Sequence, residues 1–271
     1  MNFNKQTKKV LTRLVPKGDT KESIKLFYYN LNRQKDIKFG LTKHDNKTIF
    51  RTAFKDIAML SHQALYNITD DFYNYQHFYT TKPGDIIMDA GANVGHLSIF
   101  FAKNIVHKGI VYSFEPDKFN IEAMKRNISL NPEIENNIHI NDYLLWNENK
   151  LIDFEEAGTV GSSAVSFSGK SVPVKKRAVT IDAWVKENNL DRLDFIKMDI
   201  EGAEIEAIEG AVDTIARFKP NFAIASYHYV NGEQTYIKVE EFFKKINYPC
   251  KTVHFKGTEI ITFAGRALAG M

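Results

Sequence analysis

The sequence lacks the features that define disulfide-rich, membrane-spanning and secreted proteins. Its one cysteine, Cys250, excludes an internal disulfide and a zinc site built from cysteines. No apolar run approaches the roughly 20 residues that a transmembrane helix needs. The basic residues 1–18 are followed by no hydrophobic stretch, so we expect no secretory signal. Together these absences predict a cytoplasmic protein without a membrane span.

An excess of charge of one sign is also missing. Lysine and arginine total 36 and aspartate and glutamate total 33, which leaves a net charge of +3. Such a balance does not indicate a polyanionic partner. The chain also shows neither a basic patch with interleaved aromatic residues nor an Asn/Asp-Pro-Pro-aromatic motif after the fourth predicted strand. We therefore expect no nucleic acid partner.

From about residue 85 onward, short apolar runs alternate with segments of helical periodicity, which is typical of a parallel sheet built from strand–helix–strand units. The predicted strands are Ile86–Met88, Ile110–Phe114, Ile138–Ile140, Phe195–Met198 and Phe222–Ala225. The apolar residues between 205 and 215 predict one helix after the fourth strand. Two later runs, Lys251–Phe255 and Glu259–Phe263, predict a hairpin at the far edge of the sheet. The fold class is therefore α/β, with five parallel strands, a C-terminal antiparallel hairpin and helices on both faces.

Residues 1–84 fall outside this alternation. They predict a basic helical lead-in, a hairpin at Ile37–Leu41 and Lys47–Phe54, and an aromatic-rich helical stretch from Asp56 to Tyr79. We expect two parts: residues 1–84 as a lid or a dimerisation element, and residues 85–271 as the cofactor-binding domain. The long glycine-serine loop Gly158–Ser171 is a further candidate lid, because loops of that length in compact domains are usually functional.

The most specific motif is Asp89–Gly95, where the first predicted strand turns into a helix. Open parallel sheets bind ligands at the carboxyl ends of their strands, so this position is suited to a cofactor. Gly91 allows a tight turn, and Gly95 lets the helix begin close to the sheet. Glu115 ends the next strand, where a carboxylate accepts the hydroxyls of a ribose. This spacing predicts a cofactor that contains a nucleoside.

The charge of the loop favours S-adenosylmethionine over a dinucleotide. A dinucleotide needs its pyrophosphate held by a Gly-x-Gly-x-x-Gly loop, but Asn93 stands at the middle glycine position. Asp89 would also repel a pyrophosphate, whereas it would attract the ammonium of S-adenosylmethionine. At the end of the third strand, Asp142 and Tyr143 are candidates to hold adenine, although a surface turn would use the same residues. The candidate cofactor-binding residues are Asp89, Gly91, Ala92, Asn93, Gly95, Glu115, Pro116, Asp142 and Tyr143.

Acidic residues follow the fourth strand, and a histidine follows the fifth. Asp199 is placed to point into the ligand crevice, whereas the sequence gives Glu204 no role beyond favourable charge at a helix N-terminus. His228 lies one strand over, and a histidine can remove the proton of a hydroxyl. We interpret His228 and Asp199 as the candidate catalytic residues. The alternative for His228 is a structural role.

The chain resembles the FkbM-type methyltransferases over roughly residues 48–230. The resemblance is carried, in order, by Asp89–Gly95, Phe114–Pro116, Thr180–Trp184 and Asp194–Glu204, with Phe50–Ile57 ahead of them. It implies a class I methyltransferase (Rossmann-like) sheet, S-adenosylmethionine as donor, and O-methylation of a sugar-type hydroxyl. The family's fifth strand usually ends with a glutamate before its histidine, whereas Ser226 and Tyr227 precede His228 here. This departure counts against a carboxylate-assisted or metal-bridged mechanism.

These observations predict an S-adenosylmethionine-dependent O-methyltransferase that acts on a small-molecule or glycan acceptor. The proton of the acceptor would pass to His228 or Asp199. A divalent metal near Asp199 is the secondary version, because the sequence shows no clear second and third ligand. The alternatives are an NAD-dependent oxidoreductase on a similar sheet and a non-catalytic cofactor-binding scaffold. A homodimer built on residues 1–84 is a further expectation.

Overall fold

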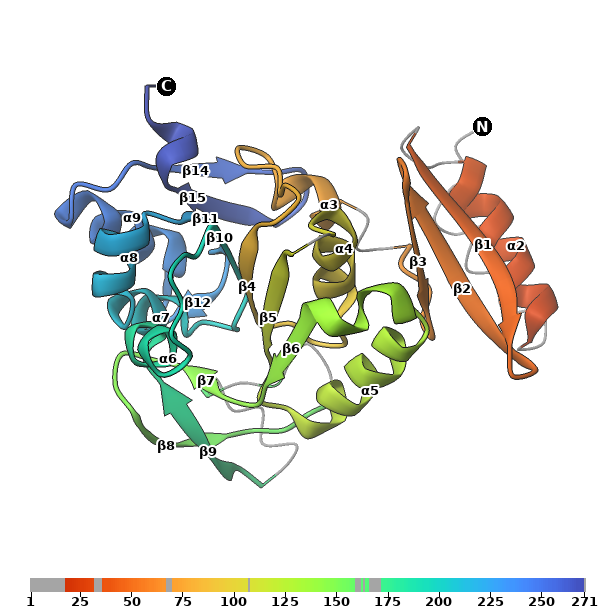
Figure 1. The fold of residues 1–271 in the computed structure, drawn as a ribbon, viewed down its shortest axis with the longest axis horizontal. Helices are drawn as coiled ribbons and strands as arrows, with labels where there is room; N and C mark the ends of the chain where they lie inside the picture. The colour runs from red at the N-terminus through yellow and green to blue at the C-terminus, as the bar shows by residue number, and fades with distance from the viewer. Residues whose placement is uncertain are drawn as a thin grey trace. The chain divides into compact units, whose positions relative to one another are not determined.

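The computed structural model describes residues 18–31, 36–66, 70–106, 108–158, 162, 164–165 and 172–270 (Figure 1). The chain divides into two compact units, Met1–Thr69 and Asp70–Met271. No helix in these described ranges has the length and apolar character needed to span a bilayer.

The smaller unit contains helix α2 (Asp19–Leu31) and an antiparallel sheet in the order β1 (Ile37–His44), β2 (Lys47–Phe54) and β3 (Ile57–Ser61). The predicted hairpin is confirmed. Asp45 and Asn46 form its tight turn, with φ of 48° and 60°. Because asparagine and aspartate tolerate this left-handed conformation, they suit a two-residue hairpin turn.

The predicted helical stretch from Asp56 to Tyr79 is wrong. Its first residues form β3, which pairs with β2 from Phe54↔Ile57 to Phe50↔Ser61, and the described helix in this stretch is the short α3 (Asp71–Asn74). Pairing with a neighbouring strand outweighs the local helical pattern here, since strand formation depends on tertiary partners.

The larger unit is built on a seven-stranded sheet in the order β14-β15-β11-β10-β4-β5-β6. The strands are β4 (Ile86–Ala90), β5 (Ile110–Phe114), β6 (Ile138–Asn141), β10 (Phe195–Met198), β11 (Asn221–Ala225), β14 (Cys250–His254) and β15 (Ile260–Ala264). The five predicted parallel strands and the terminal hairpin are confirmed. Because β15 is antiparallel to both β11 and β14, β14 runs in the same direction as the five parallel strands.

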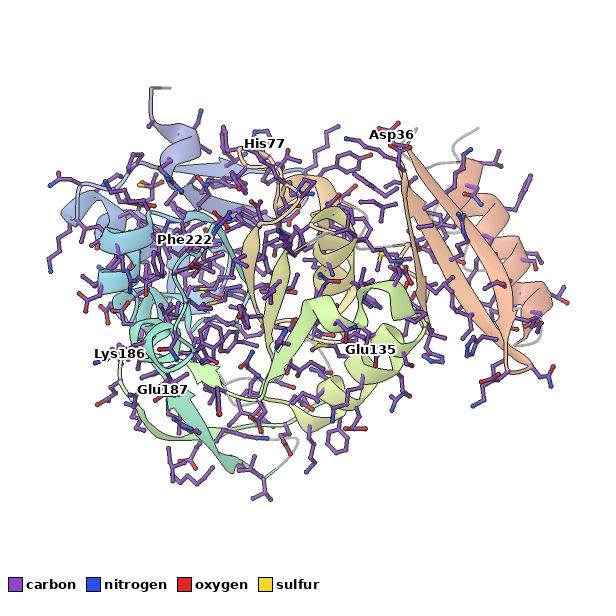
Figure 2. The ribbon with its side chains drawn as sticks, in the orientation of Figure 1. Asp36, His77, Glu135, Lys186, Glu187 and Phe222 are labelled. Atoms are coloured by element: carbon purple, nitrogen blue, oxygen red, sulfur yellow. The ribbon has the colours of Figure 1, made fainter. Side chains whose placement is uncertain are left out.

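Helices cover both faces of this sheet (Figure 1). Helices α4 (His96–Asn104) and α5 (Lys118–Ser129) lie on one face, and α6 (Ile181–Glu187), α7 (Glu204–Glu209), α8 (Val212–Phe218) and α9 (Thr235–Lys245) lie on the other. The second face encloses a core that includes Trp184, Ile208 and Phe222. Figure 2 shows Phe222 among densely packed side chains, whereas Lys186 and Glu187 lie at the surface.

The single helix predicted over residues 205–215 is instead two, α7 and α8, which break at Gly210 and Ala211. The carbonyl of Gly210 accepts a hydrogen bond from the Asp182 amide, and a Cβ at Gly210 would come within 2.2 Å of the Trp146 carbonyl oxygen. The Asp182 carboxylate then accepts from the amides of Asp213 and Thr214. Contacts with α6 therefore interrupt an otherwise continuous apolar face.

A smaller sheet in the order β7-β9-β8 lies beside this core, with β7 (Leu144–Leu145), β8 (Lys150–Phe154) and β9 (Val174–Val179). Two short strands, β12 (Tyr229–Val230) and β13 (Glu233–Gln234), pair after β11. Short 3-10 helices lie at Pro132–Asn137 (η1) and Arg266–Leu268 (η2). Most of the predicted lid loop Gly158–Ser171 lies outside the described residues.

The division between the units falls after Thr69, not at the predicted position after residue 84. Residues 70–84 pack with the large unit because Phe72 stacks on Phe100, at 4.5 Å between ring centroids, and Tyr79 stacks on Phe195, at 5.6 Å. A lid or dimerisation role for residues 1–84 stays a prediction.

Candidate functional site

The predicted cofactor loop follows β4 at the carboxyl edge of the sheet. The amides of Gly91 and Ala92 both donate to the Phe114 carbonyl, at 3.0 and 2.9 Å. Gly91 has φ of +76°, and a Cβ added to it would lie 1.8 Å from the Asp199 carbonyl oxygen. The loop therefore lies directly against the end of β10, and glycine is required there by conformation and by space.

Asn93 and Gly95 complete the turn into α4. Both have positive φ, at 50° and 83°, and Gly95 forms the N-cap of the helix. The Asn93 amide donates to Glu115 Oε2 at 2.8 Å, so the loop is tied to the end of β5. A Cβ at Gly95 would come within 2.5 Å of Met124 Cγ, which explains how the helix begins so close to α5.

Glu115 is buried at the centre of this edge, with 5% of its surface exposed. Its carboxylate accepts from the amides of Asn93 and Asp117, at 2.8 and 2.9 Å, and from Asn120 Nδ2 at 3.4 Å. Burial raises the pKa of Glu115 to about 7, although these hydrogen bonds oppose the shift. A buried carboxylate in this position suits the two hydroxyls of a ribose.

Asp117 lies at the same edge of the sheet as Glu115, and the sequence analysis did not single it out. It is buried, caps α5 through the Phe119 amide at 2.7 Å, and accepts from the amides of Ala157 and Gly158 and from Ser162 Oγ, at 2.9, 2.8 and 2.6 Å. These hydrogen bonds lower the pKa of Asp117 against the opposing effect of burial. Asp117 thus fastens the start of the glycine-serine loop to the edge where Glu115 lies. The available signal was an Asp just ahead of the helical pattern Ile121, Met124 and Ile128.

Asp89 lies at the end of β4, at the start of the cofactor loop. Its carboxylate is fully buried beneath the loop, where Oδ1 lies 3.1 Å from Lys197 Nζ and Oδ2 accepts from Ser98 Oγ at 2.5 Å. Lys197 also donates to the carbonyls of Ala90 and Gly91, at 3.2 and 2.8 Å. Burial opposes a charged Lys197, but Asp89 and Asp199 raise its pKa above the ordinary value. A direct contact between Asp89 and a cofactor ammonium stays a prediction.

The remaining candidates surround the end of β6. Pro116 is half-buried, Asp142 is exposed, and Tyr143 is half-buried with the guanidinium of Arg177 4.9 Å from the centre of its ring. The neighbouring Asn141 accepts from Trp184 Nε1 at 3.2 Å. An adenine-binding role for Asp142 and Tyr143 stays a prediction.

Asp199 and His228 come together as the strand order requires. His228 Nε2 lies 3.5 Å from Asp199 Oδ1 and 3.7 Å from Glu201 Oε2. Its Nδ1 lies 3.1 Å from Oε1 of Glu204, which is fully buried. Burial alone would lower the pKa of His228, but the Glu204, Asp199 and Glu201 carboxylates raise it to about 9.

Glu204 therefore does more than place charge at a helix N-terminus. Its Oε1 accepts from the amides of Ile200 and Gly202, at 3.1 and 3.2 Å, and the same side chain contacts His228. These bonds hold a turn in which Glu201 has φ of 56° and Gly202 has φ of 102°. Glu204 does lie in the first turn of α7, as expected. That interpretation was incomplete, because the contact of Glu204 with His228 exists only once β10 and β11 are paired.

Tyr75, which the sequence analysis missed, reaches the same cluster from the segment after α3. Its hydroxyl donates to Asp199 Oδ2 at 3.1 Å, and the residue is 2% exposed. Burial raises the pKa of Glu201 to about 7, with Asp199 adding to the shift. Burial also raises the pKa of Asp71 to about 7, together with Glu259 and Asp199. This edge therefore concentrates negative charge around one imidazole.

The similarity to known proteins covers the part of the chain that contains the cofactor loop and the residues around His228. The sequence profile of the methyltransferase FkbM domain matches residues 89–250, which is more than half of the chain. The chain belongs to the FkbM methyltransferase family. It is therefore an S-adenosylmethionine-dependent methyltransferase, as the cofactor loop predicted, and the oxidoreductase alternative is set aside.

Two curated relatives of this FkbM-family chain are methyltransferases. Methyltransferase sdnD of Sordaria araneosa is 25% identical over 192 residues, which cover 59% of this chain and 73% of that protein. The 2-O-methyltransferase NoeI of Sinorhizobium fredii is 24% identical over 156 residues, 50% of this chain and 61% of that protein. A solved methyltransferase FkbM from Methylobacillus flagellatus aligns at a TM-score of 0.49 with 19% identity, over 69% of this chain and only 45% of that one.

The residues of this FkbM domain fit S-adenosylmethionine. The backbone of Gly91 approaches the end of β10 too closely for any side chain, and Glu115 offers a buried carboxylate at the end of β5. Among the described residues that contact the loop, the Lys197 ammonium is already bound to Asp89 and to two carbonyls. A loop of this charge suits a cofactor without phosphate groups.

The close approach at Gly91 predicts a large cost for Gly91→Ala. Gly84→Ala is the matched control, because Gly84 has φ of +86° but open space around its Cβ position. The control should lose about 1–2 kcal/mol from its left-handed φ alone. Gly91→Ala should lose about 1–3 kcal/mol more, because backbone atoms must move. Urea unfolding measures both, and equal losses would contradict the close packing of the loop on β10.

The buried ion pair predicts that Lys197→Met is strongly destabilising. Removing the ammonium leaves the Asp89 carboxylate uncompensated, at a cost of about 3–5 kcal/mol in the free energy of unfolding. Lys175→Met is the control, because Lys175 forms an exposed pair with Asp153 at 3.0 Å. That change should cost less than about 1 kcal/mol. Similar urea midpoints for the two variants would show that the Lys197–Asp89 pair does not contribute this free energy of unfolding.

The raised pKa of Glu115 predicts a pH dependence of stability. Because the folded pKa is about 7 and the ordinary value is 4.5, the folded state holds this proton more tightly. The stabilising effect of the bound proton is complete below pH 4.5 and is lost as pH rises through 7, a change of about 3 kcal/mol. Glu115→Gln should flatten the fall in unfolding free energy between these values. Glu122→Gln, at an exposed position on α5, should retain the wild-type slope. If the unfolding free energy of Glu115→Gln falls with pH as steeply as in the wild type, a group other than Glu115 causes the pH dependence.

Proposed function

We propose that this methyltransferase transfers the methyl group of S-adenosylmethionine to a hydroxyl of a sugar-like or natural-product acceptor. The observation that carries the proposal is the contact between the cofactor loop, Asp89–Gly95, and the acidic cluster, which is Asp199, Glu201 and Glu204 around His228. The Asp199 amide donates to the Ala90 carbonyl at 3.0 Å, and the Asp199 carbonyl lies against Gly91. A hydroxyl held by Asp199 and His228 would therefore lie beside a cofactor bound at that loop.

The cofactor supplies a methyl group on a positively charged sulfur. The residues of the chain then have two tasks, which are to hold the acceptor oxygen in line and to activate its hydroxyl. Polar side chains that accept hydrogen bonds, including Asp199, Glu201 and Glu259, gather at this edge and match the hydroxyl groups of a carbohydrate. The name of the relative NoeI, a 2-O-methyltransferase, agrees with oxygen as the acceptor atom.

The proposal predicts that methyl transfer depends on Asp199 and His228, whereas cofactor binding does not. A panel of monosaccharide glycosides, incubated with isotopically labelled S-adenosylmethionine, should yield methyl ethers detectable by mass spectrometry. Asp199→Asn and His228→Gln should lower kcat by about 100-fold or more, because each removes a group that activates the hydroxyl. Their affinity for S-adenosylhomocysteine, measured by titration calorimetry, should stay at the wild-type value.

His254→Gln is the matched control, because His254 is an exposed histidine on β14 and should leave both measurements unchanged. Glu115→Ala should instead lose S-adenosylhomocysteine binding while NAD binds to neither protein. Transfer to amine-bearing compounds or RNA, with none to hydroxyl compounds, would overturn the proposed acceptor class. Unchanged kcat in Asp199→Asn and His228→Gln would overturn the assigned roles.

A further inference from the structure

Three side chains of the acidic cluster converge from three different elements. Asp199 follows β10, Glu204 begins α7 and His228 follows β11. One ligand atom from each lies within 4.8 Å of the other two. Three donors so close together, on elements fixed by the central sheet, can surround one small ion without rearrangement of the backbone.

Four buried polar atoms of this cluster lack hydrogen bonds. Within the described part of the chain, Asp199 Oδ1, Glu204 Oε2 and both ring nitrogens of His228 are buried without a hydrogen-bond partner. Glu204 is fully buried, and the His228 side chain is 10% exposed. Even the 3.1 Å approach of Nδ1 to Glu204 Oε1 lacks hydrogen-bond geometry. Because buried polar atoms are nearly always paired in native proteins, these atoms indicate a missing partner.

The charges of the cluster indicate that the missing partner is positively charged. The carboxylates of Asp199, Glu201 and Glu204 all lie within 3.7 Å of the one imidazole of His228. The nearby Lys197 ammonium is bound to Asp89 and to the loop carbonyls. Glu204 is buried, whereas Asp199 and Glu201 are partly exposed. Carboxylates crowded against a buried one are costly unless a cation neutralises them.

We propose that Asp199, Glu204 and His228 bind a divalent cation of the Mg²⁺ or Mn²⁺ type. Carboxylate oxygens suit these hard ions, and a single imidazole adds a ligand that Mn²⁺ accepts well. Glu201 lies 3.7 Å from His228 Nε2 and is placed to orient a water on the ion. The second and third ligands could not be identified from the sequence, because Glu204 and His228 meet Asp199 only in the folded sheet.

The role of this ion in catalysis rests on the proposed function, but its binding does not. A hydroxyl on a divalent ion loses its proton more readily, as metal-bound water does. The hydroxyl proton passes to solvent, and the oxygen forms its bond to the methyl carbon. The carbon–sulfur bond breaks with its electron pair on sulfur, and S-adenosylhomocysteine leaves. In this arrangement Asp199 and His228 activate the acceptor as ligands of the ion.

The test is direct binding of Mn²⁺ to the full chain in the absence of cofactor, followed by electron paramagnetic resonance of the free ion. The wild-type protein should bind one Mn²⁺ per chain, and Mg²⁺ should compete. Glu204→Gln and His228→Gln should each weaken Mn²⁺ binding at least tenfold. Glu206→Gln is the matched control, because Glu206 lies on the same helix outside the cluster and should bind Mn²⁺ like the wild type.

Each variant is also titrated with S-adenosylhomocysteine, which shows whether its fold is intact. Retained S-adenosylhomocysteine binding with weakened Mn²⁺ binding supports the site. If Glu204→Gln fails to fold, His228→Gln decides the test alone. No Mn²⁺ binding by the wild type, or wild-type binding by His228→Gln, overturns the cation and leaves the proposed methyl transfer standing. Stoichiometric Mn²⁺ binding without transfer to any hydroxyl would instead overturn the proposed function and leave the site.

Discussion

The arrangement of the site depends on one buried ammonium. Lys197 extends from the central strand β10 and contacts Asp89 and the carbonyls of Ala90 and Gly91 on β4. A lysine this deeply buried is stable only with such partners, so the pair fixes the loop to the strand beside it. The fixed loop sets the close approach of Gly91 to the Asp199 carbonyl. The cofactor loop and the acidic cluster are therefore in direct contact through the backbones of Gly91 and Asp199.

Two groups of acidic residues lie along this edge of the sheet, and their surroundings differ. On the β5 side, Glu115 and Asp117 are satisfied by backbone amides, so their negative charge organises the turns between strands and helices. On the β11 side, Asp199 Oδ1, Glu204 Oε2 and both ring nitrogens of His228 are buried without a hydrogen-bond partner among the described residues. The polar atoms of the first group are paired within the fold, and the second group retains buried polar atoms without partners among the described residues. Chemistry is expected where polar atoms remain unsatisfied.

Much of the fold was predictable, because each parallel strand is buried on both faces and reads as a short apolar run. The strands at Ile110–Phe114 and Phe195–Met198 were placed with their observed bounds. The errors fell where tertiary contacts overrode local pattern: β3 pairs with β2 in a stretch of helical appearance, and α6 contacts interrupt the helix at Gly210. Local periodicity contains no information about either contact.

The sequence by itself determined the cofactor class, because the glycine loop at Asp89–Gly95 and Glu115 are encoded within one strand–helix–strand unit. It also determined that Asp199 and His228 end neighbouring strands. Only the tertiary structure decided that Asp89 lies beneath the loop with Lys197, and that Glu204 and Tyr75 join Asp199 and His228. The physical reason is distance along the chain. Tyr75 and Asp199 are 124 residues apart, and only strand order and side-chain packing bring such groups into contact.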